Sequence, residues 1–279
     1  MIRAKKSLGQ NFLCDAQMSR RIVDSVSPQP SDLIIEIGPG TGALTRMLVK
    51  SSGYVVAVEI DRRLIEALRK EINSDRLSIV EADALQVNWI DLINAASRSW
   101  QTVNSSESEP RIRVVANLPY YISTPIIERL IDLRHRINDM TLMLQNEVVE
   151  RIASAPGSRD YGYLSVLVQY HTVATKLFEV PPSAFKPAPK VQSAIIRLAV
   201  RDRVAIDLDN EAKFFALVRA SFAQRRKTIF NNLKAAAVSL GLAEGIDRAL
   251  QAAGIDSQRR AETLSMGEFG ALYRALFHE

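Results

Sequence analysis

The sequence predicts an α/β fold with a mostly parallel seven-stranded sheet, followed by a small all-helical C-terminal domain. From about residue 33 to residue 200, short apolar runs alternate with segments of helical spacing. Repeated strand–helix units of this kind build a parallel sheet that helices cover on both faces. After residue 201 the segments are helical only. We therefore expect two domains, residues 1–200 and residues 201–279.

The expected strands are apolar runs that stop at a glycine or a polar residue. They lie at residues 33–38, 54–60, 77–83, 112–117, 140–148, 175–180 and 191–201. The last run alternates between apolar and polar residues, as an edge or antiparallel strand does. Residues 100–111, WQTVNSSESEPR, are polar, which predicts an exposed loop. Residues 213–241 have helical spacing and open the C-terminal domain.

The composition excludes several classes of protein. With 47% hydrophobic and 24% charged residues, the chain is typical of a globular protein. Its single cysteine, Cys14, excludes a disulfide framework and a cysteine zinc site. We expect no metal, because the three histidines lack ligand spacing: His135, His171 and His278. No signal peptide and no run of about 18 apolar residues is evident, so we expect a cytoplasmic protein.

Basic residues gather in two stretches of the chain. Residues 1–23 hold five against one aspartate, and residues 212–243 hold six and no acidic residue. Such stretches indicate a polyanionic partner, either a nucleic acid or a membrane surface. Ordinary solvated helix faces are the alternative. In the second stretch Arg225, Arg226 and Lys227 are consecutive, and we expect this part of a helix to bind phosphates.

A glycine-rich turn, EIGPGTG, follows the first expected strand at residues 36–42. Glycines let a ligand approach the backbone between a strand and a helix. The spacing G-x-G-x-G differs from the G-x-G-x-x-G of a dinucleotide site. A tight turn that binds nothing is the alternative.

Two acidic residues at later strand ends favour a nucleoside ligand. Glu59 ends the second strand, where a carboxylate can bind ribose hydroxyls, and Asp83 ends the third, where one can accept an adenine amino proton. Helix N-caps are the alternative for both. Glu36, with no lysine nearby, favours a cationic sulfonium over a pyrophosphate. This order of motifs resembles the Rossmann-like class I methyltransferases, whose cofactor is S-adenosylmethionine.

The fourth expected strand ends in NLPY, which is similar to the polar–x–Pro–aromatic signature of enzymes that methylate base amino groups. An exocyclic adenine amine is a poor nucleophile, because its lone pair is delocalised into the ring. The Asn117 side-chain oxygen and the Leu118 carbonyl can accept its two N–H bonds and orient that lone pair. Pro119 fixes the backbone, and Tyr120 offers a ring for stacking on the base. An ordinary Asn-x-Pro turn is the alternative.

A second aromatic residue, Phe185, stands in a loop with four prolines, residues 181–191. A stiff loop suits a ring that must be held as the other wall of a base-stacking slot. A core side chain beneath the loop is the alternative. The frame KxPxPKVxS favours the functional interpretation.

Seven motifs in order closely resemble those of the small-subunit ribosomal RNA adenine dimethyltransferases: KSLGQNFL, EIGPGTGALT, VEID, EADAL, NLPYYIS, FKPAPKVQSAI and QRRKTIFNNL. The resemblance implies dimethylation of two adjacent adenosines in a hairpin loop near the 3′ end of 16S ribosomal RNA. It also implies an immature 30S subunit as the substrate, a role in ribosome biogenesis and rRNA contacts by the C-terminal domain. We expect a monomer.

The resemblance assigns roles to individual residues. Tyr120 and Phe185 match the base-stacking pair, and the segment with Asn11 and Leu13 closes over the cofactor. The positions that match cofactor contacts are Asn11, Leu13, Gly38, Gly40, Glu59, Ile60, Asp83, Ala84 and Asn117.

Three alternatives stay open. A large-subunit rRNA enzyme of the antibiotic-resistance type shares the chemistry, but it typically has isoleucine at Leu118 and lacks FKPAPKVQS combined with QRRKTIFNN. A non-catalytic nucleic-acid-binding relative would not need the cofactor motifs. A nicotinamide-dependent oxidoreductase would need G-x-G-x-x-G.

Overall fold

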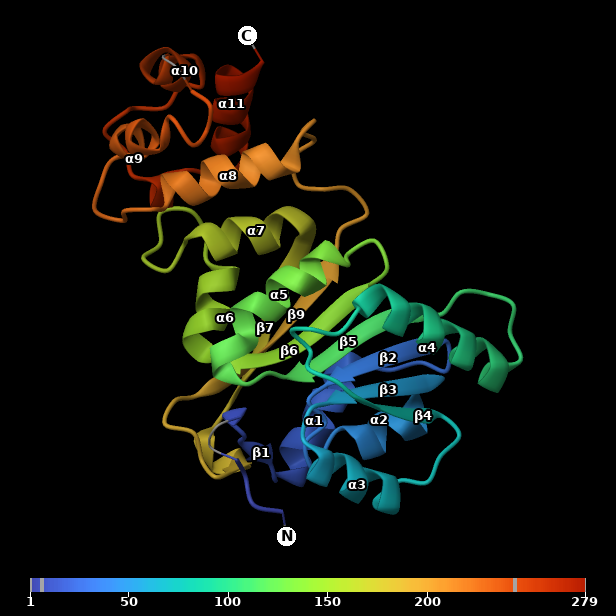
Figure 1. The fold of residues 1–279 in the computed structure, drawn as a ribbon. Helices are drawn as coiled ribbons and strands as arrows, with labels where there is room; N and C mark the ends of the chain where they lie inside the picture. Colours follow the sequence, from blue (N-terminus) through green and yellow to red (C-terminus); the bar gives the residue numbers. More distant parts are fainter. Residues whose placement is uncertain (1, 6–7, 243–244, 279) are drawn as a thin grey trace. The chain divides into compact units, whose positions relative to one another are not determined.

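The computed structural model describes residues 2–5, 8–242 and 245–278, which form two compact units (Figure 1). The first unit comprises Met1–Val149 and Thr175–Val200, and the second comprises Glu150–Ala174 and Arg201–Glu279. Residues 150–174 thus group with the C-terminal helices, whereas the sequence analysis assigned them to the first domain. The functions expected of the two domains stay predictions.

The first unit is built on a seven-stranded sheet with the strand order β4-β3-β2-β5-β6-β9-β7. In chain order the strands are β2 (Asp32–Ile37), β3 (Tyr54–Glu59), β4 (Leu77–Glu81), β5 (Arg111–Asn117), β6 (Asp139–Gln145), β7 (Thr172–Val180) and β9 (Ser193–Val200). The first five are parallel to one another, and β9 pairs antiparallel with β6. The predicted mostly parallel seven-stranded sheet is therefore confirmed. β7, and not β9, forms the edge.

Helices cover both faces of this sheet (Figure 1). Strands β2 and β3 are buried along their whole length, which explains their continuous apolar sequences. On one face α1 (Ala16–Val26) and α2 (Thr45–Ser51) share a core with the strands, in which Ile22 and Leu48 pack with Ile34, Val55 and Val115. The helix α3 (Arg62–Glu71) lies on the same side, whereas α4 (Trp89–Asn104) and α5 (Ser123–Asp132) lie on the other.

The prediction of an exposed loop over residues 100–111 is wrong in its first half. Helix α4 continues to Asn104, and Ser105 ends it in the left-handed conformation. Ile93, Ala96 and Trp100 are buried at helical spacing, so the polar composition conceals an amphipathic helix.

The strand expected at residues 140–148 ends sooner than predicted. β6 stops at Gln145, and α6 (Asn146–Ala153) begins at the next residue.

The C-terminal part of the second unit is helical, as predicted. Its α-helices are α8 (Glu211–Ser221), α9 (Ile229–Ala236), α10 (Ile246–Ala252) and α11 (Met266–Phe277), and they share with α7 (Tyr163–His171) of the same unit a core that contains Phe214, Phe269 and Tyr273. The helical segment expected over residues 213–241 is interrupted between α8 and α9. The Asn232 side chain donates to the carbonyl oxygens of Ser221 (2.7 Å) and Gln224 (3.1 Å), which holds this turn. Over the described residues, no helix is long and apolar enough to cross a membrane.

Candidate functional site

The candidate site lies at the carboxyl ends of the parallel strands. The chain runs from β2 outward to β3 and β4 and then returns to β5, so the strand order reverses between β2 and β5. Ligands of open α/β sheets bind in the crevice at such a point. A pocket lies here, and every residue predicted for the cofactor or the chemistry lines it: Asn11, Leu13, Gly38, Gly40, Glu59, Ile60, Asp83, Ala84, Asn117, Leu118, Pro119, Tyr120 and Phe185.

The turn after β2 exposes its backbone to this pocket. Gly38 and Gly40 have φ angles of +69° and +56°, in the left-handed region that favours glycine. A Cβ on Gly40 would lie 3.3 Å from the ring of Phe12, and one on Gly38 would meet only the Asn117 carbonyl oxygen, at 3.8 Å. The open backbone at Gly38 fits a turn that cradles a ligand.

Glu59, the last residue of β3, is a buried carboxylate held by three backbone amides. Its Oε1 accepts from the N–H groups of Ile60 and Asp61, both at 2.9 Å, and its Oε2 accepts from Gly40 at 3.3 Å. Burial raises the pKa of Glu59, although these hydrogen bonds lower it. Ile60 beside it is 48% exposed and offers an apolar surface in the pocket. This pairing suits a ribose and an attached base.

Asp83 lies two residues beyond β4 and takes part in the following turn. Its Oδ1 accepts from the Leu85 N–H at 2.8 Å, as a capping aspartate does. The helix N-cap alternative is not met, because residues 84–86 form a turn and the next helix, α4, is capped by Asn88; Asp83 also lines the pocket. Ala84 follows on the pocket wall, and its carbonyl accepts from the Trp89 Nε1–H at 3.1 Å.

Glu36 is a pocket residue that is absent from the predicted site. It lies inside β2, is 2% exposed and lines the pocket. Burial raises the pKa of Glu36 to about 7; the Thr45 hydroxyl lowers it, and the charge of Glu59 adds to the rise. Its place directly before the glycine turn was the available sequence signal.

The charges around the pocket are acidic. The described residues that line it include Glu36, Glu59 and Asp83, but no lysine, arginine or histidine. Such a lining favours a cationic ligand and disfavours a pyrophosphate. S-adenosylmethionine, with its sulfonium and ammonium groups, fits this set of residues.

Asn117 and Leu118 are fixed by the segments on either side of them. The Asn117 Nδ2 donates to the Asn11 carbonyl at 3.4 Å, which joins the end of β5 to the N-terminal segment. The Leu118 N–H donates to the Met143 carbonyl of β6 at 3.2 Å, and the Leu118 side chain is buried. Of the N-terminal motif, residues 8–13 line the pocket, whereas Lys6 and Ser7 lie outside the described residues.

Two tyrosines continue the wall beyond Pro119. Tyr120 begins a short 3₁₀ turn, Tyr120–Ile122, and its hydroxyl lies 2.9 Å from the Ser193 Oγ at the start of β9. Tyr121 also lines the pocket and is 62% exposed. Ser193 and Tyr121 are both absent from the predicted site, although both lie within motifs noted in the sequence.

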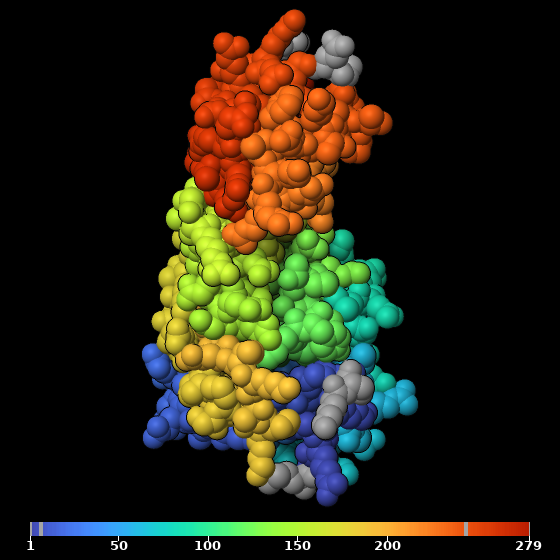
Figure 2. Space-filling view, turned by 90° about the vertical axis from the view of Figure 1, so that its left-hand side faces the viewer, coloured from blue at the N-terminus to red at the C-terminus, as the bar shows by residue number. Residues whose placement is uncertain are grey.

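Phe185 stands between the pocket and the core. It begins β8 (Phe185–Lys186), which pairs antiparallel with β1 (Phe12–Leu13), and the yellow and blue parts of the surface that contain these segments adjoin in Figure 2. Its side chain is 6% exposed and packs in the core with Leu13 and Val180, and it also lines the pocket. Both interpretations of Phe185 therefore describe part of its environment. Strands of two residues show no periodicity, so the sequence analysis missed this pair.

The predicted RNA-binding residues belong to the second unit, whereas the residues that line the pocket belong to the first. Arg225, Arg226 and Lys227 are exposed in the turn between α8 and α9, which corrects their expected place on a helix. Thr228 caps α9 by accepting from Asn231, so the helix begins only after the basic residues. Arg225 forms an ion pair with Glu262 at 2.9 Å.

Comparisons of the sequence match nearly the whole chain to one family. A family model described as Ribosomal RNA adenine dimethylase matches residues 1–276. Ribosomal RNA small subunit methyltransferase A of Moorella thermoacetica is 44% identical over 277 residues, which cover 98% of this chain and 93% of that protein. The protein of the same name from Geobacillus kaustophilus is 46% identical over 274 residues, which cover 98% and 90%.

Solved structures with a similar fold include a dimethyladenosine transferase and a 23S rRNA methyltransferase. A dimethyladenosine transferase from Plasmodium falciparum has a TM-score of 0.75 at 25% identity and covers 94% of this chain and 95% of its own. The 23S rRNA methyltransferase ErmE has a TM-score of 0.68 at 25% identity, with coverage of 95% and 99%.

Proposed function

Because the chain belongs to the family of ribosomal RNA adenine dimethylases, which use S-adenosylmethionine, we propose that it dimethylates two adjacent adenosines in the hairpin loop near the 3′ end of 16S ribosomal RNA. The substrate is an immature 30S subunit, so the reaction is a step of ribosome biogenesis. The enzyme acts as a monomer in the cytoplasm. Relatives named for the small subunit are 44% and 46% identical, against 25% for the large-subunit enzyme ErmE, which supports this choice.

One observation carries the proposed chemistry: the NLPY tetrapeptide lies at the same edge of the sheet as an acidic pocket, among whose described lining residues none is basic. The Asn117 Oδ1 and the Leu118 carbonyl accept the two N–H bonds of the adenine amine and orient its lone pair. Tyr120 and Phe185 hold the base between them. The bound cofactor supplies an electrophilic methyl group. No strong base is needed, because the nitrogen becomes acidic only after it is methylated, and orientation is the main contribution.

We assign the cofactor to the remaining walls of the pocket. Glu59, Ile60 and Ala84 line the pocket; Glu59 would accept hydrogen bonds from the ribose hydroxyls of a bound cofactor, and Ile60 and Ala84 would contact its adenine. Asp83 accepts from the adenine amino group. The turn with Gly38 and Gly40 lets the methionine part approach the backbone, and Asn11, Leu13 and Asn117 complete the enclosure.

The basic turn of the second unit supplies affinity for the RNA. Arg225, Arg226 and Lys227 contact phosphates and set register with little base specificity. Binding of a 16S fragment should therefore fall steeply between low and moderate salt, and removal of Arg226 and Lys227 should flatten this dependence. Equal slopes for the native protein and that variant would remove these residues from the RNA surface.

The substrate is tested in a strain that lacks the gene. Dimethyladenine blocks reverse transcription, so primer extension on 16S rRNA should show a strong stop near the 3′ end in the parent strain and none in the deletion strain. The native gene should restore the stop, and a gene with Asn117→Ala should not. A stop that persists in the deletion strain contradicts the proposal, and a stop that is lost from 23S rRNA instead indicates the large-subunit alternative.

A further inference from the structure

The N-terminal segment that lines the pocket is tied to a buried carboxylate outside it. Asp61 is 1% exposed and follows the strand end that carries Glu59. Its Oδ1 accepts from the Lys5 Nζ at 3.2 Å, and its Oδ2 accepts from the Gln10 Nε2 at 3.2 Å. The two donors come from positions more than 50 residues earlier in the chain.

The donors are also joined to each other. The Lys5 backbone N–H donates to the Gln10 Oε1 at 2.7 Å, and the Gln10 N–H donates to the Lys5 carbonyl at 3.4 Å. Lys5 and Gln10 are therefore linked to each other and flank in sequence Leu8 and Gly9, both of which line the pocket. Asp61 binds the side chains of both linked residues.

Local structure alone does not require these two contacts. Asp61 caps α3 by accepting from the Arg63 N–H at 3.2 Å, and the Arg63 guanidinium donates to both of its oxygens, at 3.0 Å and 2.6 Å. Arg63 therefore provides both a cap contact and a counter-ion. Lys5 and Gln10 add a link to another segment.

The same residue is connected to the predicted ribose site. The Asp61 backbone N–H donates to the Glu59 Oε1 at 2.9 Å. Asp61 thus contacts the pocket residue Glu59 through its backbone and the pocket residue Gln10 through its side chain. The chemical centre has a separate link to that segment, the contact of Asn117 with Asn11.

We propose that Asp61 is a positioning residue that fastens the N-terminal segment over the adenosine end of the cofactor pocket. It does not line the pocket itself, and it acts through Lys5 and the pocket residue Gln10 on the N-terminal segment. The inference rests on the proposed assignment of S-adenosylmethionine to this pocket. Loss of the link should weaken retention of the cofactor, while the orientation of the target amine by Asn117 and Leu118 is kept.

Variants of two equally exposed basic residues distinguish this role from the mere loss of a positive charge beside Asp61. Lys5 and Arg63 each form an ion pair with Asp61, and their side chains are 44% and 43% exposed. Lys5→Met removes one of the two side-chain contacts between Asp61 and the segment, whereas Arg63→Met removes a cation of the same exposure and leaves both contacts intact. The double variant Lys5→Met, Gln10→Ala removes both side-chain contacts from the segment.

Hydrogen–deuterium exchange of the full-length, cofactor-free protein measures how firmly the link holds the N-terminal segment. Amides in residues 8–13 should exchange about fivefold faster in Lys5→Met and more than about tenfold faster in the double variant, and should be unchanged in Arg63→Met. Calorimetry with S-adenosylhomocysteine should show a weaker Kd by similar factors in the first two variants only. In methyl transfer, KM for the cofactor should rise more than kcat falls.

The outcomes distinguish the failure of this inference from the failure of the proposed function. Equal exchange of residues 8–13 in the native protein and the double variant, with unchanged melting temperatures, overturns the link. Equal effects of Lys5→Met and Arg63→Met also overturn it, because they indicate only the loss of a charge. If the native protein binds no S-adenosylhomocysteine, the cofactor assignment fails, while the exchange data still report on the link.

Discussion

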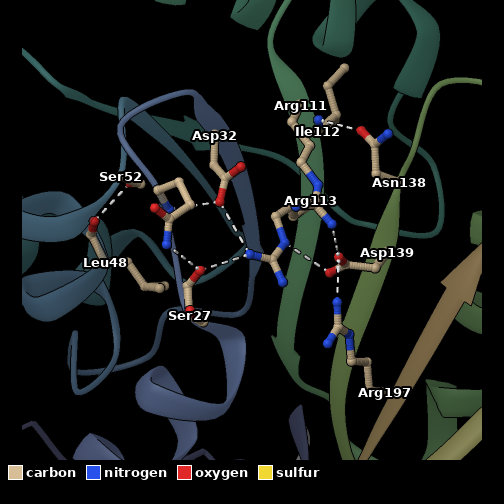
Figure 3. A network of polar contacts seen from close by, with 11 residues as sticks. Ser27, Asp32, Leu48, Ser52, Arg111, Ile112, Arg113, Asn138, Asp139 and Arg197 are labelled. Atoms are coloured by element: carbon tan, nitrogen blue, oxygen red, sulfur yellow. Dashed lines mark hydrogen bonds and ion pairs between the residues drawn. The ribbon is translucent and has the colours of Figure 1, made fainter.

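Buried acidic residues of the central sheet have different partners at the amino ends of the strands and in the pocket at the carboxyl ends. At the amino ends of the strands, Asp32 of β2 and Asp139 of β6 are matched by arginines (Figure 3). Arg113 of β5 bridges them, with its Nη1 3.1 Å from Asp32 and its Nε 2.9 Å from Asp139. Arg111 and Arg197 complete the group around Asp139.

At the carboxyl ends the acids that line the pocket, Glu36, Glu59 and Asp83, have no such partners among the described residues, in contrast to Asp61 outside the pocket, which pairs with Lys5 and Arg63. Glu36 lies four residues after Asp32 in the same strand and is almost as buried, yet no basic residue in the described chain lines its pocket. Burial of an unpaired carboxylate is costly unless it is protonated or a ligand supplies the missing charge. One strand thus carries a structural acid at one end and an acid available to a cationic ligand at the other.

The largest effect is expected at the amino end. Arg113→Met leaves Asp32 buried without its cation, which should lower the free energy of unfolding by about 3–5 kcal/mol. Arg197→Met is the matched control: its side chain is 39% exposed and Asp139 keeps two arginines, so the cost should stay below about 1 kcal/mol. Chemical denaturation measures both. Adding Asp32→Asn to Arg113→Met should recover part of the loss.

Equal losses of unfolding free energy in Arg113→Met and Arg197→Met would contradict the conclusion that the buried Arg113 stabilises the sheet more than the partly exposed Arg197. If Arg113→Met does not fold, the double variant with Asp32→Asn still tests the point, because it removes the unpaired charge along with the arginine.

At the carboxyl end a substitution should affect catalysis more than stability. Asn117→Ala should lower kcat by about 10²- to 10³-fold, because the amine loses one of the acceptors that orient it. Cofactor binding should weaken far less than kcat falls, because the 3.4 Å contact of Asn117 with Asn11 is only one of the contacts at the cofactor site, and the unfolding midpoint should change little. Asn138→Ala is the control at the opposite end, where the Asn138 Oδ1 accepts from the Ile112 N–H at 2.8 Å. It should cost about 1 kcal/mol of stability and leave kcat unchanged. Near-normal turnover by Asn117→Ala would refute the proposed orientation of the amine.

Glu36 predicts a pH dependence with a definite sign. Its pKa in the folded protein, about 7, lies above the ordinary 4.5, so the folded state binds its proton more tightly than the unfolded state. The resulting stability is complete below about pH 4.5 and is lost as the pH rises through about 7. The loss at pH 8 should reach up to about 3 kcal/mol in the cofactor-free protein. Glu36→Gln should abolish this part of the decline.

The measurement is the unfolding midpoint of the cofactor-free protein from pH 5 to pH 8. Glu66→Gln, on the exposed face of α3, is the control and should keep the native slope. If Glu36→Gln and Glu66→Gln give the same slope as the native protein, Glu36 does not titrate in this range.

The sequence was most informative where a residue's role follows from its place at a strand end. Gly38, Glu59 and Asn117 were assigned to one edge because parallel strands bring their carboxyl ends together, and all three line the pocket. The fully apolar strands β2 and β3 were equally clear. At Trp100 the polar composition predicts an exposed loop, whereas the residue is buried, because the polar face of helix α4 conceals its apolar face.

Other features depend on contacts between distant residues, which no local pattern encodes. The pairing of β1 with β8 joins segments about 170 residues apart, and the link between Lys5 and Asp61 spans 56. The raised pKa of Glu36 follows from complete burial, which is a property of the assembled sheet. The basic residues 225–227 leave the helix because Thr228 caps α9 and Asn232 holds the preceding turn.

The smallest effect is expected from the Tyr120–Ser193 hydrogen bond, which belongs to the carboxyl end although Ser193 begins the antiparallel strand β9. Ser193 is 1% exposed and its Oγ lies 2.9 Å from the Tyr120 hydroxyl. Ser193→Ala and Tyr120→Phe each remove this bond, and each should lower kcat/KM by about fivefold through a less fixed ring. If the bond acts as a unit, the double variant should be no worse than either single one. Additive losses would show that the two side chains act independently, and the ring of Tyr120 would then be positioned by its backbone turn alone.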